Sequence, residues 1–181
     1  MLGLLSTFLL QAEKVTASWE LYSEEHTDLD GWPYDQADYD DHQEAKDMTL
    51  WHLFTPVREG AASLLDAAEA TVQSLSGALA QNRWDWQLTQ LRGALEHIDA
   101  AQDQFLERLA TDRGTGEAVR EAVAERGAKA SEVLSVWVSH GRAVLEIHAS
   151  TVRAGQSGIR LAARTTRAPA PAPSSPARRS R

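Results

Sequence analysis

The feature that most constrains this chain is a repeat of apolar residues spaced alternately four and three positions apart. Such steps place side chains on one stripe of an α-helix, and the stripe must then pack against other helices. Alternation of apolar and polar residues, which marks a half-buried strand, is scarce. The repeat therefore predicts an all-α protein. In the first segment it runs through Met1, Leu5, Phe8, Ala12, Val15, Trp19 and Tyr22, with His26 and Leu29 extending it.

Breaks in this repeat divide the chain into about five helices. One break is Thr55-Pro56, which has the form of a helix start, with threonine as N-cap and proline at the first helical position. Short connections make neighbouring helices run in opposite directions. We therefore predict an antiparallel helical bundle with coiled-coil-like heptad packing over residues 1–163, with helices at about 1–27, 35–54, 56–81, 83–111 and 116–163.

The last of these helices is long for a compact domain. Gly127, Gly141 and Gly155 fall on one stripe, where small residues allow a close approach of another helix or a bend. The pair Gly155 and Gly158 is the preferred place for a kink. Residues 164–181 are rich in proline, alanine and arginine, and no apolar core can form there. A disordered basic tail is predicted for them.

Charge is distributed unevenly along the chain. Residues 1–112 carry 21 acids and 6 bases, whereas residues 113–181 carry 5 acids and 12 bases. A basic end of this kind can bind a polyanion such as a nucleic acid, or it can fold back on the acidic half. The candidate partner-binding arginines are Arg153, Arg160, Arg164, Arg167, Arg178, Arg179 and Arg181.

Composition excludes several classes of protein. The chain has no cysteine, so disulfides, thiolate metal sites and cysteine nucleophiles are absent. The apolar first twelve residues are too few to span a bilayer, and no basic segment precedes them as in a signal peptide. We expect a cytoplasmic protein without a membrane span.

Residues 34–47, YDQADYDDHQEAKD, form the most acidic stretch. If this helix buries Tyr34, Ala45, Met48 and His52, then Asp40, Glu44 and Asp47 form an outward acidic row. No histidine has an acid three residues before it, which disfavours a di-iron bundle. No cofactor is therefore expected. The residues left as weak candidates for a bound cation are Asp38, Asp41, His42 and His26.

Tryptophan and glutamine positions add two expectations. Trp19, Trp51, Trp84 and Trp137 lie on or beside apolar stripes and are predicted to fill the core, whereas Trp86 lies off its stripe and is a candidate anchor for a partner. Gln102 is the one polar residue in the stripe of its helix, and such residues fix helix register.

One catalytic pattern occurs. Small helical ribonucleases of the HEPN type carry an arginine followed by four to six residues and a histidine. Arg92 and His97 in RGALEH fit it, as do Arg142 and His148 in RAVLEIH, although chance accounts for two occurrences. The leading hypothesis is a non-catalytic interaction or scaffold module that self-associates or docks a protein partner. The alternative is a metal-independent HEPN-like ribonuclease using Arg92 and His97. A weaker alternative is nucleic-acid binding through the basic tail.

Overall fold

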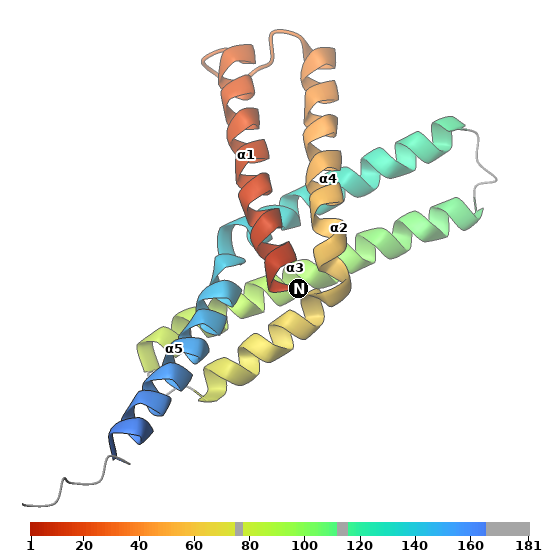
Figure 1. Ribbon diagram of the computed structural model, residues 1–181. Coiled ribbons are helices and arrows are strands. Elements are labelled where there is room, and N and C mark those ends of the chain that lie inside the picture. Colours follow the sequence, from red (N-terminus) through yellow and green to blue (C-terminus); the bar gives the residue numbers. More distant parts are fainter. Residues whose placement is uncertain (75–77, 112–115, 166–181) are drawn as a thin grey trace, which may run out of the picture. The chain divides into compact units, whose positions relative to one another are not determined.

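The structure, a computed structural model, describes residues 1–74, 78–111 and 116–165 (Figure 1). Over these residues the secondary structure is helical, with one isolated β-bridge between Thr27 and Pro33. The prediction of an all-α bundle is confirmed. The disordered tail is predicted for residues 164–181. Those from 166 onward lie outside the described part of the chain. The elements are α1 (Leu2–His26), α2 (Gln36–Ser74), α3 (Ala78–Thr111), α4 (Gly116–His140) and α5 (Arg142–Thr165).

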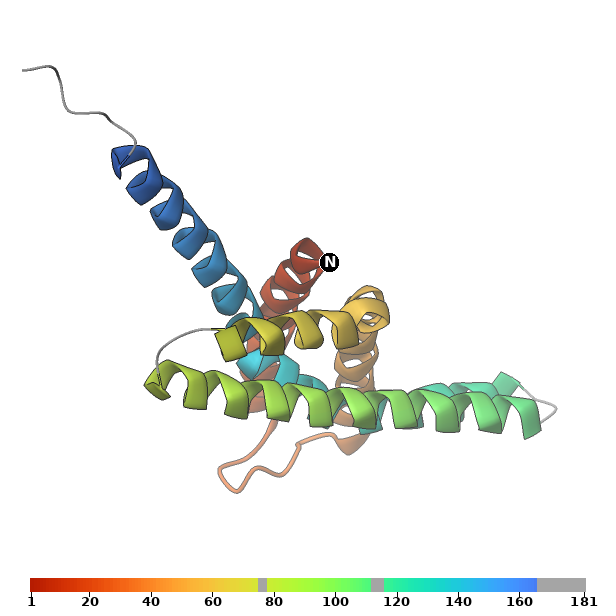
Figure 2. The same ribbon diagram turned by 90° about the horizontal axis from the view of Figure 1, so that it is seen from below.

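The chain forms two compact units, Met1–His148 and Ala149–Arg181. In the second unit, residues 149–165 continue α5. The first unit holds two helical hairpins, α1 with α2 and α3 with α4, and both views show α3 and α4 lying side by side (Figures 1 and 2). The loop-forced antiparallel pairing expected from the sequence is therefore present within this unit.

The core of the first unit lies where α2 meets α1, α3 and α4. Phe8 of α1 packs edge-on against Phe54 of α2 at 5.1 Å between ring centres, and Phe54 packs against Trp137 of α4 at 5.0 Å. These three rings are fully buried. Apolar side chains of α3 complete the core, with burial as the main stabilising term: Leu88, Leu91, Leu95 and Ile98.

Thr55 and Pro56 do not start a helix, because α2 runs through them from Gln36 to Ser74. Proline lacks the N–H that would bond the carbonyl of His52, and this loss bends a helix without ending it where packing holds both sides. The buried stripe does continue across the proline, through Phe54 and Val57. The Thr55 hydroxyl donates to the Trp51 carbonyl at 2.9 Å. Figure 1 shows α2 changing direction near its middle.

The predicted last helix is interrupted at Gly141 and not at Gly155 and Gly158, whose backbone is helical. A Cβ at Gly141 would lie 2.5 Å from the Trp137 carbonyl oxygen and 3.0 Å from a methyl group of Leu9. Only glycine fits there without displacing α1 or the preceding turn. Gly127 faces Asp47 and Met48, where a Cβ would make ordinary contact, with Cβ of Asp47 nearest at 3.7 Å.

The sequence-based assignment of buried and exposed faces to the acidic stretch is wrong, because the buried face is rotated by part of a helical turn from the predicted one. Tyr34 and His52 are exposed, whereas Asp47, predicted to face outward, is only 5% exposed. Asp47 precedes Leu50 and Trp51 by three and four residues, so it shares their buried stripe. The Lys46 ammonium lies 3.0 Å from Oδ1 of Asp47 and compensates part of its burial.

None of the described helices combines the length and the apolar character that a bilayer crossing requires.

Candidate functional site

The loop between α1 and α2 is held by hydrogen bonds across it. Oδ1 of Asp28 accepts from the backbone N–H groups of Asp30 and Trp32, each at 2.9 Å. The Asp28 N–H donates to the Trp32 carbonyl at 2.8 Å, and the Tyr34 N–H donates to the His26 carbonyl at 2.9 Å. Gly31 allows the turn because its φ of 83° lies in the region that side chains disfavour. The sequence DLDGWP therefore folds into a defined turn.

This turn presents three large side chains to solvent. Leu29 is 107% exposed, Trp32 70% and Tyr34 72%. We call these three residues the hairpin tip. Apolar side chains gathered in this way on a structured turn are typical of contact surfaces, since tryptophan and tyrosine dominate the energetics of protein interfaces.

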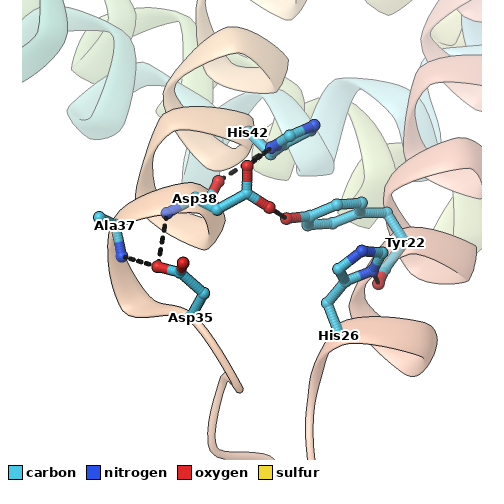
Figure 3. A network of polar contacts seen from close by, with 6 residues as sticks. All are labelled: Tyr22, His26, Asp35, Ala37, Asp38 and His42. Carbon is cyan, nitrogen blue, oxygen red and sulfur yellow. Dashed lines mark hydrogen bonds and ion pairs between the residues drawn. The ribbon is translucent and has the colours of Figure 1, made fainter.

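Directly behind the tip, Tyr22 lies between two histidines. Its ring stacks on His26 at 4.0 Å and on His42 at 4.2 Å, and Figure 3 shows the tyrosine ring between the two imidazoles. Trp19 stacks on Tyr22 at 5.7 Å, and Tyr39 of α2 contacts Trp19 at 4.9 Å. These aromatic side chains join the ends of α1 and α2 that carry the loop.

Asp38 links the stack to the start of α2. Its Oδ2 accepts a hydrogen bond of 2.6 Å from the Tyr22 hydroxyl, and its Oδ1 lies 3.4 Å from Nδ1 of His42 (Figure 3). Asp35 caps the helix, since its Oδ1 accepts from the N–H groups of Ala37 and Asp38 at 3.1 and 3.2 Å. Desolvation, the hydrogen bond to Asp38 and the charge of Asp38 raise the pKa of Tyr22 to about 12.

The weak cation candidates are brought close but are not arranged as one site. His26 and His42 lie against the same tyrosine ring, and Figure 3 shows them on either side of it. A metal at about 2.1 Å from each nitrogen cannot bridge two rings so separated. Nδ1 of each histidine lies 2.8–2.9 Å from a backbone carbonyl oxygen. Asp41 is exposed. Among the described residues no group of three or more histidine or carboxylate side chains could hold a metal ion.

Residues 15–45, which we call the arm, carry the hairpin tip, and all their charged side chains apart from the histidines are acidic. Residues 15–45 contain ten aspartates and glutamates and no lysine or arginine. Acids nearest the tip are exposed: Glu24, Glu25, Asp28, Asp30 and Asp35. The field around the tip is therefore negative and attracts basic surfaces.

No match to this chain was found among protein-family models, curated proteins or solved structures. What the chain does is therefore inferred from its own residues.

Arg92 and His97, the ribonuclease candidates, are on α3. The Arg92 guanidinium donates to Asp66 at 2.7 Å and to Glu69 at 3.0 Å, both on α2, and these carboxylates raise its pKa. Nδ1 of His97 lies 2.7 Å from the Gly93 carbonyl oxygen. A phosphate would have to compete with two carboxylates for Arg92, so this geometry does not favour the ribonuclease hypothesis, which stays a prediction.

The prediction that four tryptophans fill the core is wrong for Trp19, which packs against Tyr22 and Tyr39 and not in the core. Trp51 and Trp137 are buried, Trp84 packs at the edge of the core and Trp19 is half-buried. Trp86 is 55% exposed and meets His140 edge-on at 5.0 Å. Its predicted role as a partner anchor stays a prediction.

The predicted basic surface lies mostly beyond the described side chains. Arg153 is exposed and its Nε donates to the Ala149 carbonyl at 3.2 Å. The side chains of Arg160 and Arg164 fall outside the described residues, as do Arg167, Arg178, Arg179 and Arg181 entirely.

Sequence reasoning missed the hairpin tip, because DLDGWP reads first as a helix breaker. The 4–3 repeat places Leu29 on the buried stripe of the first helix, but this is wrong, because α1 ends at His26 and Leu29 is fully exposed. A signal was present all the same: Leu29, Trp32 and Tyr34 fall within six positions around the helix breakers Gly31 and Pro33. Large apolar residues in a turn without a core to enter indicate a contact surface.

Proposed function

We propose that the chain is a non-catalytic helical interaction module that docks a protein partner through the hairpin tip. The observation that carries this is the exposure of Leu29, Trp32 and Tyr34 on a turn whose backbone is fixed by hydrogen bonds. Presenting aromatic anchors in a fixed geometry reduces the conformational entropy lost on binding. The tip is therefore suited to insert into an apolar pocket on a partner.

Charge determines the kind of partner. Ten acids without one lysine or arginine in residues 15–45 favour a basic protein surface around that pocket. Two tips facing each other would bring the same acids together, so self-association through this surface is disfavoured by like-charge repulsion. The acidic arm likewise opposes docking onto a nucleic acid or an anionic bilayer.

The experiment compares Trp32→Ala with Trp86→Ala, because both tryptophans are exposed and only Trp32 is at the tip. Tagged full-length protein is purified from its native host, and a partner that co-purifies in stoichiometric amount is identified and titrated by calorimetry. We expect a basic protein whose affinity falls ~30-fold or more in Trp32→Ala, the size of an interface hot spot. The proposal requires Trp86→Ala to bind like the unmodified chain; a loss of affinity confined to Trp86→Ala would assign the anchor to Trp86 instead of the tip.

Three results would contradict the proposal. One is equal affinity of Trp32→Ala and the unmodified chain for the partner. Another is an acidic partner, since charge complementarity would then be reversed. The third is a homo-oligomer in native mass spectrometry that dissociates in Trp32→Ala, because the tip would then bind a second copy.

A further inference from the structure

A pocket between α3 and α4, with a volume of about 460 Å³, is lined by an unusual set of cations. Arg108 comes from α3, and Arg126 and Lys129 come from α4. The carboxylates in its lining are Glu107 and Glu125. Positive groups therefore outnumber negative ones in this pocket, although the chain as a whole carries a formal charge of −8.

Two of the three cations are already neutralised. Glu125 pairs with Arg108, and Lys129 lies 2.7 Å from the same carboxylate. Lys129 also donates to the Gln104 side chain at 3.1 Å. Arg108 also lies 3.9 Å from Glu121, so Glu121 and Glu125 together pair with Arg108 and Lys129, and neither carboxylate pairs with Arg126.

Arg126 has aromatic rings where a carboxylate would be expected. Its guanidinium carbon lies 4.4 Å from the centre of the Trp51 ring and 4.2 Å from that of Phe105. Rings stabilise the cation through its faces, but they leave the N–H groups, which point outward in the guanidinium plane, without acceptors.

The N–H groups of Arg126 are poorly satisfied. Nη1 donates to Gln102 at a long 3.4 Å, and Nε is buried without an acceptor among the described residues. No Asp or Glu of the described part lies within ion-pair distance. Burial and the nearby charge of Arg58 lower the pKa of Arg126, as expected for a cation that lacks a counter-ion. A desolvated charge of this kind is costly unless an anion pairs with it.

We propose that the pocket beside Arg126 binds a phosphate group, with the Arg126 guanidinium as the principal donor and Lys129, which keeps one ammonium N–H beyond its bonds to Glu125 and Gln104, as a second donor. Guanidinium offers paired donors in a plane, the geometry that phosphate oxygens accept. The pocket has room for more than a phosphate ion, so a small phosphomonoester also fits. This site is separate from the hairpin tip and does not depend on it.

The test titrates the full-length chain with inorganic phosphate and with phenyl phosphate, at constant ionic strength set by sodium chloride. Calorimetry measures affinity, and the side-chain Nε–H resonance of Arg126 locates the site in a ¹⁵N-labelled sample. We expect saturable binding that shifts this resonance. Tighter binding of phenyl phosphate assigns the site to a phosphomonoester, and equal affinities assign it to the free ion.

Three variants test the assignment. Arg126→Gln should weaken binding ~10-fold or more, the cost of losing charged hydrogen bonds. Lys129→Gln, at an exposed position, should weaken it less and keeps the test decisive if Arg126→Gln fails to fold. Arg120→Gln makes the same charge change at an exposed site of α4 and should bind normally. The proposal is overturned if the Arg126 resonance does not move, or if Lys129→Gln and Arg120→Gln lose equal affinity.

Discussion

Tyr22 is the side chain on which the contacts behind the hairpin tip converge. It touches both histidines by its faces, Trp19 by its ring and Asp38 by its hydroxyl. Deprotonation of that hydroxyl would place a phenolate 2.6 Å from a carboxylate. The folded chain therefore favours the neutral tyrosine more strongly than the unfolded chain does.

This preference predicts a loss of stability at alkaline pH. In the unfolded chain Tyr22 ionises from its ordinary pKa of 10.0, whereas in the folded chain its pKa is about 12. Between these values the unfolded state binds fewer protons, so the free energy of unfolding falls as pH rises. Below pH 10.0 the contribution is fully present. The free energy of unfolding can be measured by urea unfolding at a series of pH values. Plotted against pH, it should differ in slope between the unmodified chain and Tyr22→Phe only over this interval.

The matched control is Tyr34→Phe, which removes a hydroxyl from an exposed residue of the tip. Its free energy of unfolding should follow that of the unmodified chain across the same pH range. If Tyr22→Phe also followed the unmodified chain, the Tyr22–Asp38 contact would not be the cause of the loss of stability at alkaline pH.

The sequence reveals single polar residues within apolar stripes, but it does not show which of them contact one another. Gln102 was identifiable as the polar member of its stripe, and Arg126 occupies the corresponding place in the stripe of Val123, Ala130 and Trp137. The structure joins the two, since Arg126 donates to Gln102. Spacing along one helix does not state which partner helix faces it, so the pairing needed the tertiary fold.

At the level of helices, the 4–3 repeat predicts which segments are helical better than it predicts where they stop. Pro56 and Gly141 show why. A proline at a helix start and a proline at a bend have the same local sequence, and burial of Phe54 and Val57 on both sides decides for the bend. Glycines on one stripe are likewise equivalent until a neighbour such as Leu9 approaches one of them.

Gly141 is therefore expected to tolerate no side chain. Gly141→Ala places a methyl group against the Trp137 carbonyl and Leu9, and should destabilise the fold by ~1–3 kcal/mol, as for an overpacked core. Gly93→Ala is the control: a Cβ there meets nothing within 4 Å, in the interior of α3. That variant should gain ~0.5–1 kcal/mol through helix propensity. Thermal or urea unfolding measures both, and a stabilised Gly141→Ala would disprove the close approach.

Across the first unit, burial is divided between a core and an arm. The arm, residues 15–45, includes no buried side chain, whereas α1 before it and α2 after it supply Phe8, Leu9, Leu50 and Phe54 to the core. The arm is held instead by half-buried rings such as Trp19, Tyr22 and Tyr39. Its acids also repel one another, because no lysine or arginine lies between Val15 and Ala45. Few buried contacts and like charges both lower local stability.

The arm should consequently open without unfolding the core. In native-state hydrogen exchange, amides of residues 15–45 should exchange ~10-fold or more faster than those of α3 around Leu91, a difference of ~1.4 kcal/mol. Raising the salt concentration from 0.1 to 1 M, which shortens the Debye length from ~10 to ~3 Å, should slow exchange in the arm selectively. Tyr22→Ala should speed it, because the ring stack is lost, while Tyr34→Ala should leave it unchanged. Uniform exchange in arm and core would contradict this prediction, because it would mean that the rings stabilise the arm as well as burial stabilises the core.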